Sequence, residues 1–179
     1  MRLFIAIELP ADVKDQTERA AGDLKQRVEA GRFPGKQNYH ITLAFLGEVP
    51  RQRLDSVKSA MDSCRAEPFT LTLGGLGRFR RREGDVVWRK VEAPDALFSL
   101  QKDLSDSLIQ RGFELESRKF TPHITLARGA VFKNGFGTVA PGSAPDDVSF
   151  TVSRMTLMES RLTGGKRVYT PMYTTVLGA

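Results

Sequence analysis

The sequence contains one pentapeptide twice, His-Ile-Thr-Leu-Ala, at residues 40–44 and 123–127. In each half of the chain a run of β-forming residues ends near a proline, Pro10 or Pro94, and a helical pattern and then the pentapeptide follow at almost equal distances. Self-similarity of this kind indicates a repeated supersecondary unit. The chain is therefore expected to fold as two similar halves, each containing a strand, a helix and a strand.

Hydrophobic periodicity assigns the elements around this repeat. Alternating or continuous apolar patterns predict strands at 2–9, 39–46, 69–76, 85–92, 123–128, 148–159 and 167–177. Apolar residues spaced three and four apart predict helices at about 11–30, 54–64 and 95–112, and a segment rich in Gly and Pro predicts a loop at 129–147. We expect an α+β fold in a single domain covering residues 1–179, with two pseudo-symmetric lobes around a central groove. Each lobe would be an antiparallel sheet with helices on its outer face.

Composition is that of an ordinary globular protein. The chain has 179 residues, 40% hydrophobic and 27% charged, so it can bury a core without disulfides or a structural metal. Cys64 is the only cysteine, and a buried thiol suits a reducing compartment. No apolar run approaches the ~20 residues of a membrane span, and Glu8 and Pro10 interrupt the apolar start. We expect a cytoplasmic monomer without membrane contact.

The charge balance favours an anionic partner. The chain has 27 Lys and Arg against 21 Asp and Glu, a formal net charge of +6, and nucleic acid is the obvious class of partner. The densest basic cluster is Arg78 with Arg80, Arg81 and Arg82. It lies between glycines, where a solvated turn is the simpler interpretation.

Both histidines of the chain begin a copy of the pentapeptide. Residues i and i+2 of a strand share a face, so His40 lies beside Thr42 and His123 beside Thr125, while the apolar residues between them face the core. Two lobes related by a pseudo-two-fold axis would bring these polar faces together. The sequence therefore predicts a groove lined by two imidazoles and two hydroxyls.

Two facing imidazoles suit general acid and base catalysis on one reacting atom, because imidazole titrates near pH 6.5. The hydroxyls of Thr42 and Thr125 can donate to phosphoryl oxygens, and Arg128 can add a forked cationic donor. Arg128 is five residues after His123, on the opposite face of a regular strand. It reaches the groove only if a bulge, the strand end or its own long side chain brings it round.

Metal and cofactor chemistry has little support in this sequence. With both histidines assigned to catalysis and one cysteine in the chain, no nitrogen or sulfur ligand set remains for zinc, although a magnesium ion held by carboxylates stays open. We expect no cofactor and no metal.

Two other classes of function remain: a non-catalytic RNA- or nucleotide-binding module that uses the same groove, and a metal-dependent phosphohydrolase. Phe79 and Trp88 either stack on a base or pack at the rim.

The paired motifs resemble those of the two-histidine phosphoesterase superfamily, and within it the RNA 2′,3′-cyclic phosphodiesterases, also called 2′-5′ RNA ligases. The resemblance covers nearly the whole chain. It rests on Arg-Leu-Phe-Ile-Ala-Ile at the N-terminus, Asn-Tyr-His-Ile-Thr-Leu-Ala-Phe-Leu-Gly at 38–47, Phe-Thr-Pro-His-Ile-Thr-Leu-Ala-Arg at 120–128, and Glu-Ser-Arg-Leu with a glycine turn before Val-Tyr-Thr near the C-terminus.

The resemblance implies a substrate, a reaction and two catalytic roles. The substrate would be RNA or an oligonucleotide that ends in a 2′,3′-cyclic phosphate. His40 would donate a proton to the departing 3′-oxygen, and His123 would accept the proton of the attacking water, leaving a 2′-phosphate. The same site would also join a cyclic phosphate to a 5′-hydroxyl without ATP. Hydrolysis is the expected direction, since the cyclic phosphate is the higher-energy species in water.

Overall fold

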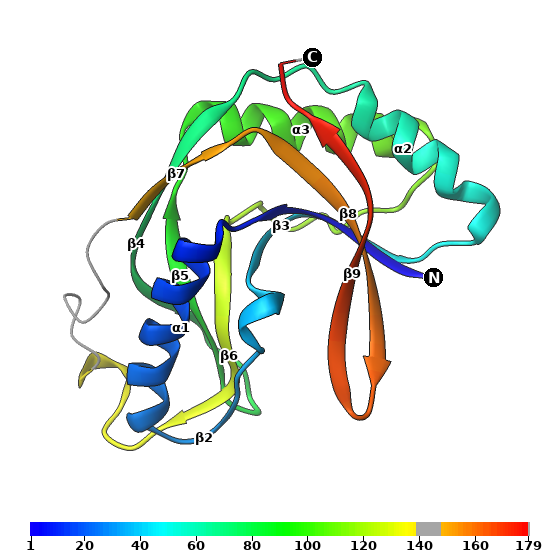
Figure 1. The fold of residues 1–179 in the computed structure, drawn as a ribbon. Coiled ribbons are helices and arrows are strands. Elements are labelled where there is room, and N and C mark those ends of the chain that lie inside the picture. Colours follow the sequence, from blue (N-terminus) through cyan, green and yellow to red (C-terminus); the bar gives the residue numbers. More distant parts are fainter. Residues whose placement is uncertain (139–147, 179) are drawn as a thin grey trace.

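The computed structural model describes residues 1–138 and 148–178 (Figure 1). Nine strands in these residues form two antiparallel sheets. The first sheet has the order β3 (His40–Glu48), β1 (Arg2–Glu8), β8 (Arg154–Thr163), β9 (Lys166–Val176). The second has the order β2 (Val28–Arg32), β6 (His123–Phe132), β5 (Asp85–Glu92), β4 (Phe69–Phe79), β7 (Val148–Val152).

The two sheets repeat one plan, and β3 of the first lies beside β6 of the second. In each sheet the strand that carries the pentapeptide pairs with an earlier strand of the chain, and a long helix lies between the two in sequence. β3 pairs with β1, and β6 pairs with β5. The predicted α+β arrangement of two pseudo-symmetric lobes is therefore confirmed.

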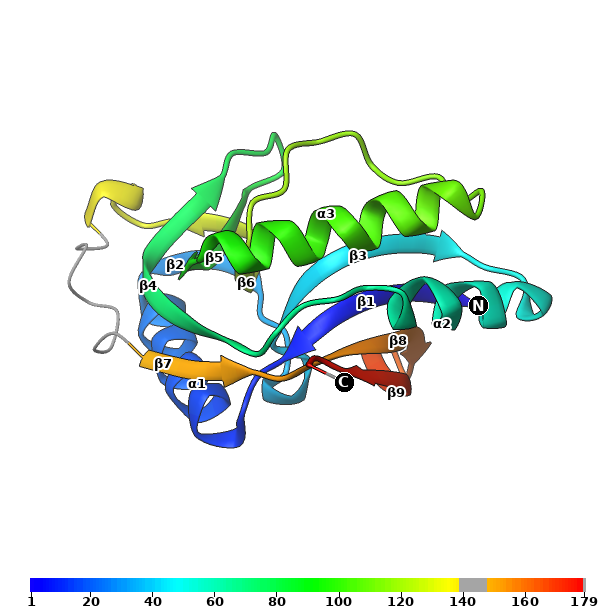
Figure 2. The same cartoon turned by 90° about the horizontal axis from the view of Figure 1, so that it is seen from above.

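The helices are exchanged between the lobes, a feature that the sequence did not indicate. Helix α1 (Ala11–Gln26) follows β1 of the first sheet but packs against β2 and β6 of the second. Helix α3 (Asp95–Gln110) follows β5 of the second sheet but packs against β3 of the first and against α2 (Leu54–Asp62) (Figure 2). Three short 3₁₀ helices complete the described chain, at Lys36–Asn38, Arg51–Arg53 and Phe136–Thr138. None of the described helices has the length and apolar character needed to span a membrane.

One continuous cluster of buried apolar side chains includes residues of both sheets and of all three α-helices. The pentapeptides contribute to it as their period of two predicts. Ile41 and Ile124 are fully buried, whereas His40 and His123 at the start of the same strands are only partly buried. The apolar face of each motif therefore packs in the core, and the polar face points away from it.

Each pentapeptide contains a β-bulge at its leucine. In β6, Leu126 and Ala127 are consecutive and both buried, because the pairing of β5 with β6 shifts by one residue there. After the bulge the alternation resumes one residue late, so the exposed Arg128 returns to the side of His123 and Thr125. The bulge that Arg128 needs in order to reach the groove is therefore present.

The first motif has the same bulge with a different residue after it. Leu43 and Ala44 are both buried, and the register of β1 with β3 shifts at this point. Phe45 then occupies the place that corresponds to Arg128. The guanidinium carbon of Arg2 lies 4.8 Å from the centre of the Phe45 ring. The two motifs thus share a backbone shape and differ in charge.

The predicted end of the first helix was wrong, because long-range pairing outweighs the local pattern there. The helix predicted at 11–30 ends at Gln26, and Val28–Arg32 is strand β2, paired with β6. Val28 continues the apolar spacing of the helix, but it is β-branched and Gly31 follows, and both residues fit an extended strand better than a helix.

The predicted loop at 129–147 begins later than expected, because β6 continues to Phe132 along β2. Residues 133–138 include the 3₁₀ helix Phe136–Thr138, and residues 139–147 of the predicted loop lie outside the described residues. The single strand predicted at 148–159 is two strands, β7 in the second sheet and β8 in the first, separated at Ser153. The alternation of β7 is interrupted by two consecutive exposed residues, Ser153 and Arg154, and the apolar positions resume one residue late in β8. This break in the period of two marks the point at which the chain changes sheets.

Gly84 fixes the turn between β4 and β5 against β6. Its φ is +99°, and a Cβ at this position would lie 2.6 Å from the carbonyl carbon of Gly129. Gly84→Ala would therefore introduce both backbone strain and a clash with main-chain atoms. We expect a loss of about 1–3 kcal/mol in the free energy of unfolding, measured by urea denaturation.

Gly35→Ala is the matched control for this measurement. Gly35 has a φ of −67°, and no atom lies within 4 Å of the place that a Cβ would take there. Alanine at this position should be neutral or stabilising by up to about 1 kcal/mol. Equal losses in the two variants would contradict the close approach of the turn to β6.

Candidate active site

His40 and His123 occupy equivalent places, each at the first residue of its strand, and β3 and β6 lie side by side. The two imidazoles are close enough for the charge of His123 to lower the pKa of His40. The charge of Arg128 acts on both. The structure therefore brings together His40, His123 and Arg128. Thr42 lies two residues after His40 on the same strand face, and Thr125 lies two residues after His123.

The Nδ1 atom of each imidazole is held by the carbonyl group two residues earlier. His40 Nδ1 lies 2.6 Å from the Asn38 oxygen, and His123 Nδ1 lies 2.7 Å from the Thr121 oxygen. A carbonyl oxygen only accepts, so Nδ1 is the donor and carries the proton in the neutral ring. This leaves Nε2 of both rings as the atom that exchanges protons in the groove.

The two Nε2 atoms differ in their neighbours. His40 Nε2 lies 3.0 Å from Thr42 Oγ1. The hydroxyl donates to the neutral ring and accepts from the protonated one. No equivalent bond joins His123 to Thr125 within the described chain. The free groove therefore has one imidazole held at both nitrogens and one held only at Nδ1.

Aromatic rings flank His40. The centre of its ring lies 4.9 Å from that of Phe4 on β1 and 5.2 Å from that of Tyr169 on β9. Tyr169 meets the imidazole edge-on, at an interplanar angle of 90°. These rings exclude water from one side of His40 and limit its side-chain rotation. The role of Tyr169 had no clear signal in the sequence, since β9 is distant along the chain.

His123 has its own aromatic pair on the second sheet. Its ring centre lies 5.1 Å from that of Phe79 on β4 and 5.9 Å from that of Trp88 on β5. Trp88 lies over Gly77, where a Cβ would come within 2.3 Å of the indole. Phe79 and Trp88 therefore pack beside a histidine, the rim position that was one of two sequence-based interpretations.

Burial is the main cause of the pKa shifts of both imidazoles. The pKa of His40 is lowered to about 4, mainly by burial; the hydrogen bond to the Asn38 carbonyl opposes the shift, and the positive charges of His123, Arg128 and Lys14 add to it. The pKa of His123 is also lowered, by burial and by the charges of Arg128 and Arg118. At neutral pH both rings are therefore uncharged in the free groove.

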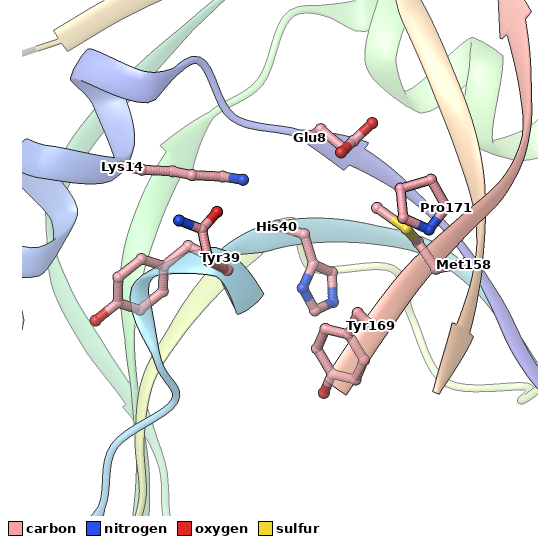
Figure 3. A pocket seen from close by; sticks show the side chains of 8 residues that line it. Glu8, Lys14, Tyr39, His40, Met158, Tyr169 and Pro171 are labelled. Carbon is pink, nitrogen blue, oxygen red and sulfur yellow. The ribbon is translucent and has the colours of Figure 1, made fainter. Parts of the chain in front are cut away.

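A pocket of about 150 Å³ opens on one side of His40, between α1, the segment before β3, and β9 (Figure 3). Lys14 of α1 and Glu8 of β1 line it, with Tyr169 on the opposite wall. Glu8 Oε2 accepts a hydrogen bond of 2.9 Å from the Thr156 hydroxyl. Sequence reasoning missed Glu8, although it pairs directly with His40 across β1 and β3.

Asn38 connects His40 to the β8–β9 hairpin. Its side-chain Nδ2 donates to the Arg167 carbonyl at 2.8 Å, and its own carbonyl holds His40 Nδ1. The segment that orients His40 is thus anchored to a strand 129 residues further along the chain. No comparable side-chain anchor is present at Thr121 among the described residues.

Within the described residues there is no group of three or more His, Cys, Asp or Glu side chains placed to hold a metal ion.

Comparison with known families agrees with this geometry. The model of the 2′-5′ RNA ligase superfamily matches residues 9–164. The chain belongs to this superfamily. The match covers both pentapeptides and includes strands of both lobes.

Relatives within the superfamily carry one name. A protein from Thermotoga maritima called RNA 2′,3′-cyclic phosphodiesterase is 31% identical over 97% of this chain and 94% of its own length. The protein of the same name from Escherichia coli is 34% identical over 96% of this chain and 93% of its own length. One from Geobacillus stearothermophilus is 38% identical over 70% of this chain, but the match spans only 41% of that relative.

Solved structures of other proteins share the fold of this chain. The crystal structure of Escherichia coli LigT complexed with 3′-AMP superimposes with a TM-score of 0.86 at 33% identity, and it covers 99% of this chain and 98% of LigT. A phosphodiesterase domain of MHV ns2, at 15% identity and a TM-score of 0.59, shares the fold alone. The two-lobed architecture thus persists where little sequence identity remains.

The two histidines of the chain allow a direct test of the pKa values, since each gives its own ring signals in NMR. We expect His40 to titrate at about 4 and His123 below the ordinary value of 6.5. Sulfate should raise both pKa values, because a bound anion stabilises the imidazolium form. The His123→Gln variant assigns the signals. A His40 pKa near 6.5 without sulfate would contradict the desolvated site.

Proposed function

We propose that the chain is an RNA 2′,3′-cyclic phosphodiesterase, which hydrolyses a terminal 2′,3′-cyclic phosphate to a 2′-phosphate by two-histidine acid and base catalysis without a metal. The observation that carries the proposal is the pair of imidazoles on adjacent strands, each fixed at Nδ1 with Nε2 left to exchange protons. The names of relatives that match almost the whole chain support the same reaction.

The proposed chemistry is an in-line displacement at phosphorus. His123 Nε2 accepts a proton from water as the water oxygen bonds to phosphorus. The bond from phosphorus to the 3′-oxygen breaks, and His40 Nε2 donates a proton to that oxygen. The products are a 2′-phosphate and a 3′-hydroxyl. His123 then releases its proton and His40 regains one, which restores the starting state.

The bound phosphate resolves an apparent conflict in this assignment. A proton donor must be protonated, yet burial keeps the pKa of His40 at about 4 in the free groove. The negative charge of a cyclic phosphate raises this pKa when it binds. We assign Thr42 and Thr125 to hydrogen bonds with the phosphate oxygens, and Arg128 to the stabilisation of its charge. The bulge in β6 and the effect of Arg128 on both imidazoles support this placement.

Further parts of the proposal concern the protein as a whole. Residues 1–179 act as one domain, an inference supported by the core that both sheets share. The protein works as a cytoplasmic monomer, and its buried free Cys64 suits a reducing compartment. Its partner is RNA with a cyclic phosphate end. The same groups also support ATP-independent 2′-5′ ligation, in which a 5′-hydroxyl takes the place of water. His123 accepts the proton of this hydroxyl as its oxygen bonds to phosphorus, and His40 donates a proton to the departing 3′-oxygen.

The decisive experiment incubates the protein and EDTA with an oligonucleotide that ends in 2′,3′-cyclic phosphate, and identifies the terminus formed. We expect a 2′-phosphate. His40→Ala and His123→Ala should each lower kcat by about 10²- to 10⁴-fold, and the double variant should be little worse than either. Lys102→Ala, on the exposed face of α3, is the control.

Other results would replace the proposal. Retention of the RNA with an unchanged end would indicate a binding module. Loss of turnover with EDTA, restored by a divalent cation, would indicate a metal-dependent phosphohydrolase. Near wild-type turnover in either single variant would exclude the two-histidine mechanism.

The pH dependence tests how the two protons are shared. The profile of kcat/KM should be bell-shaped with its maximum below pH 6.5, because it reports the free protein, in which both histidine pKa values are lowered. The profile of kcat should be displaced to higher pH, since the bound phosphate raises both values. Two coincident profiles, or a rate that rises steadily with pH, would contradict this account.

A further inference from the structure

Two arginines lie directly opposite each other on the second sheet, Arg32 of β2 and Arg128 of β6. Both side chains are exposed, and directly opposite residues of an antiparallel pair project to the same face. Like charges in this arrangement destabilise a sheet. Within the described residues, neither arginine has a carboxylate at salt-bridge distance. The pair therefore forms a concentration of positive charge that the described part of the protein does not neutralise.

Strand β2 places this pair at one end of the catalytic groove. β5 occupies one edge of β6, so β3 and β2 both lie along the other edge. β3 contacts β6, and His40 at the start of β3 is close enough to His123 at the start of β6 for its pKa to be affected. β2 pairs with the end of β6, from Arg128 onward. The boundary between the sheets thus leads from the two imidazoles to Arg32 and Arg128. The effect of Arg128 on the pKa of both histidines agrees with this geometry.

A second basic group lies at the same end. Gly84 approaches the backbone of Gly129 closely enough to exclude a side chain, so the turn that contains Arg80–Arg82 lies beside the residue after Arg128. The three arginines of this turn are exposed. Glu83 is in the same turn and offsets one charge. A solvated turn was the simpler interpretation of this cluster from sequence, and the structure places the turn at the positive end of the groove.

The distance from the catalytic centre indicates what this charge can bind. Five residues separate His123 from Arg128, roughly 13–16 Å of strand at 3.3 Å per residue with one residue absorbed by the bulge. The long side chain of Arg128 extends back far enough for its charge to act on both imidazoles, whereas Arg32 is not among the charges that act on either ring. Arg128 therefore serves the phosphate between the imidazoles, and Arg32 lies beyond it. A single nucleic acid strand that leaves the site along the groove carries its next phosphates toward this end, and a positively charged groove is the usual means of following such a backbone.

We propose that Arg32, beside Arg128, forms a subsite for the internal phosphodiester that precedes the terminal nucleotide. This inference rests on the proposed function, and it specifies the substrate class as oligonucleotide ends in preference to cyclic mononucleotides. The mononucleotide has no internal phosphate, so it gains nothing from Arg32. The RNA chain therefore extends from the histidines toward the end of β6.

The test compares two substrates with the same reacting end, adenosine 2′,3′-cyclic phosphate and an RNA tetranucleotide that ends in the same group. Arg32→Ala should lower kcat/KM for the tetranucleotide by about 5- to 10-fold, mainly through KM, as expected for one charge-assisted contact. Hydrolysis of the mononucleotide should stay within about twofold. The slope of log kcat/KM against log salt for the tetranucleotide should fall by about 0.7.

Arg51→Ala is the matched control, since Arg51 is also an exposed arginine and lies in the 3₁₀ helix before α2. It should affect neither substrate. Equal effects of Arg32→Ala on both substrates, or no effect on either, would overturn the subsite.

Binding measurements separate this proposal from the catalytic one. If the wild-type protein hydrolyses neither substrate, the proposed function fails, and the subsite is judged by affinity for a 3′-phosphorylated tetranucleotide and for 3′-AMP. A preference for the tetranucleotide that disappears in Arg32→Ala supports the subsite. A preference that the variant retains, or its absence in the wild-type protein, overturns it.

Discussion

The site depends on the burial of one face of two neighbouring strands. β3 and β6 each place an isoleucine, a leucine and an alanine in the common core, and the period of two then sends the histidine and threonine to the other face. A slip of one residue in either strand would bury an imidazole and expose the apolar set. The free energy that packs the core is therefore also what turns the two imidazoles toward the groove, where the carbonyl groups at Nδ1 fix the orientation of the rings.

The electrostatic character of the groove follows from that placement. Aromatic neighbours remove water from both imidazoles, while arginine and lysine side chains supply positive charge close by. Both effects disfavour a charged imidazole, so the free groove holds positive charge on groups that cannot lose it and none on the histidines. A bound anion favours the protonated form of the imidazoles instead. The fixed positive charges attract the anion, and its negative charge stabilises a proton on the rings. Ligand binding and protonation are thus coupled by the same few contacts.

Sequence reasoning succeeded where the signal lies within a single strand or helix. The duplicated pentapeptide predicted the paired strands, the two-lobed α+β fold and the shared face of His40 and Thr42. Features that depend on pairing between distant segments gave no such signal. Tyr169 comes to His40 through β9, Glu8 through the register of β1, and β2 exists because the end of β6 offers it a partner. The bulges at Leu43 and Leu126 likewise depend on the opposite strand.

The exchange of helices between the lobes determines how the halves depend on each other. The apolar stripe of α1 is covered by the sheet of the other half, and α3 covers the sheet that contains β3. A fragment cut between α2 and β4 would leave α1 and β2 without the strands they pack on, and β3 without its cover. Neither half is a self-sufficient folding unit, so the chain must be made almost to its end before either imidazole is held in place. A duplicated sequence has thus become an obligate pair, in which each half acts as the scaffold of the other.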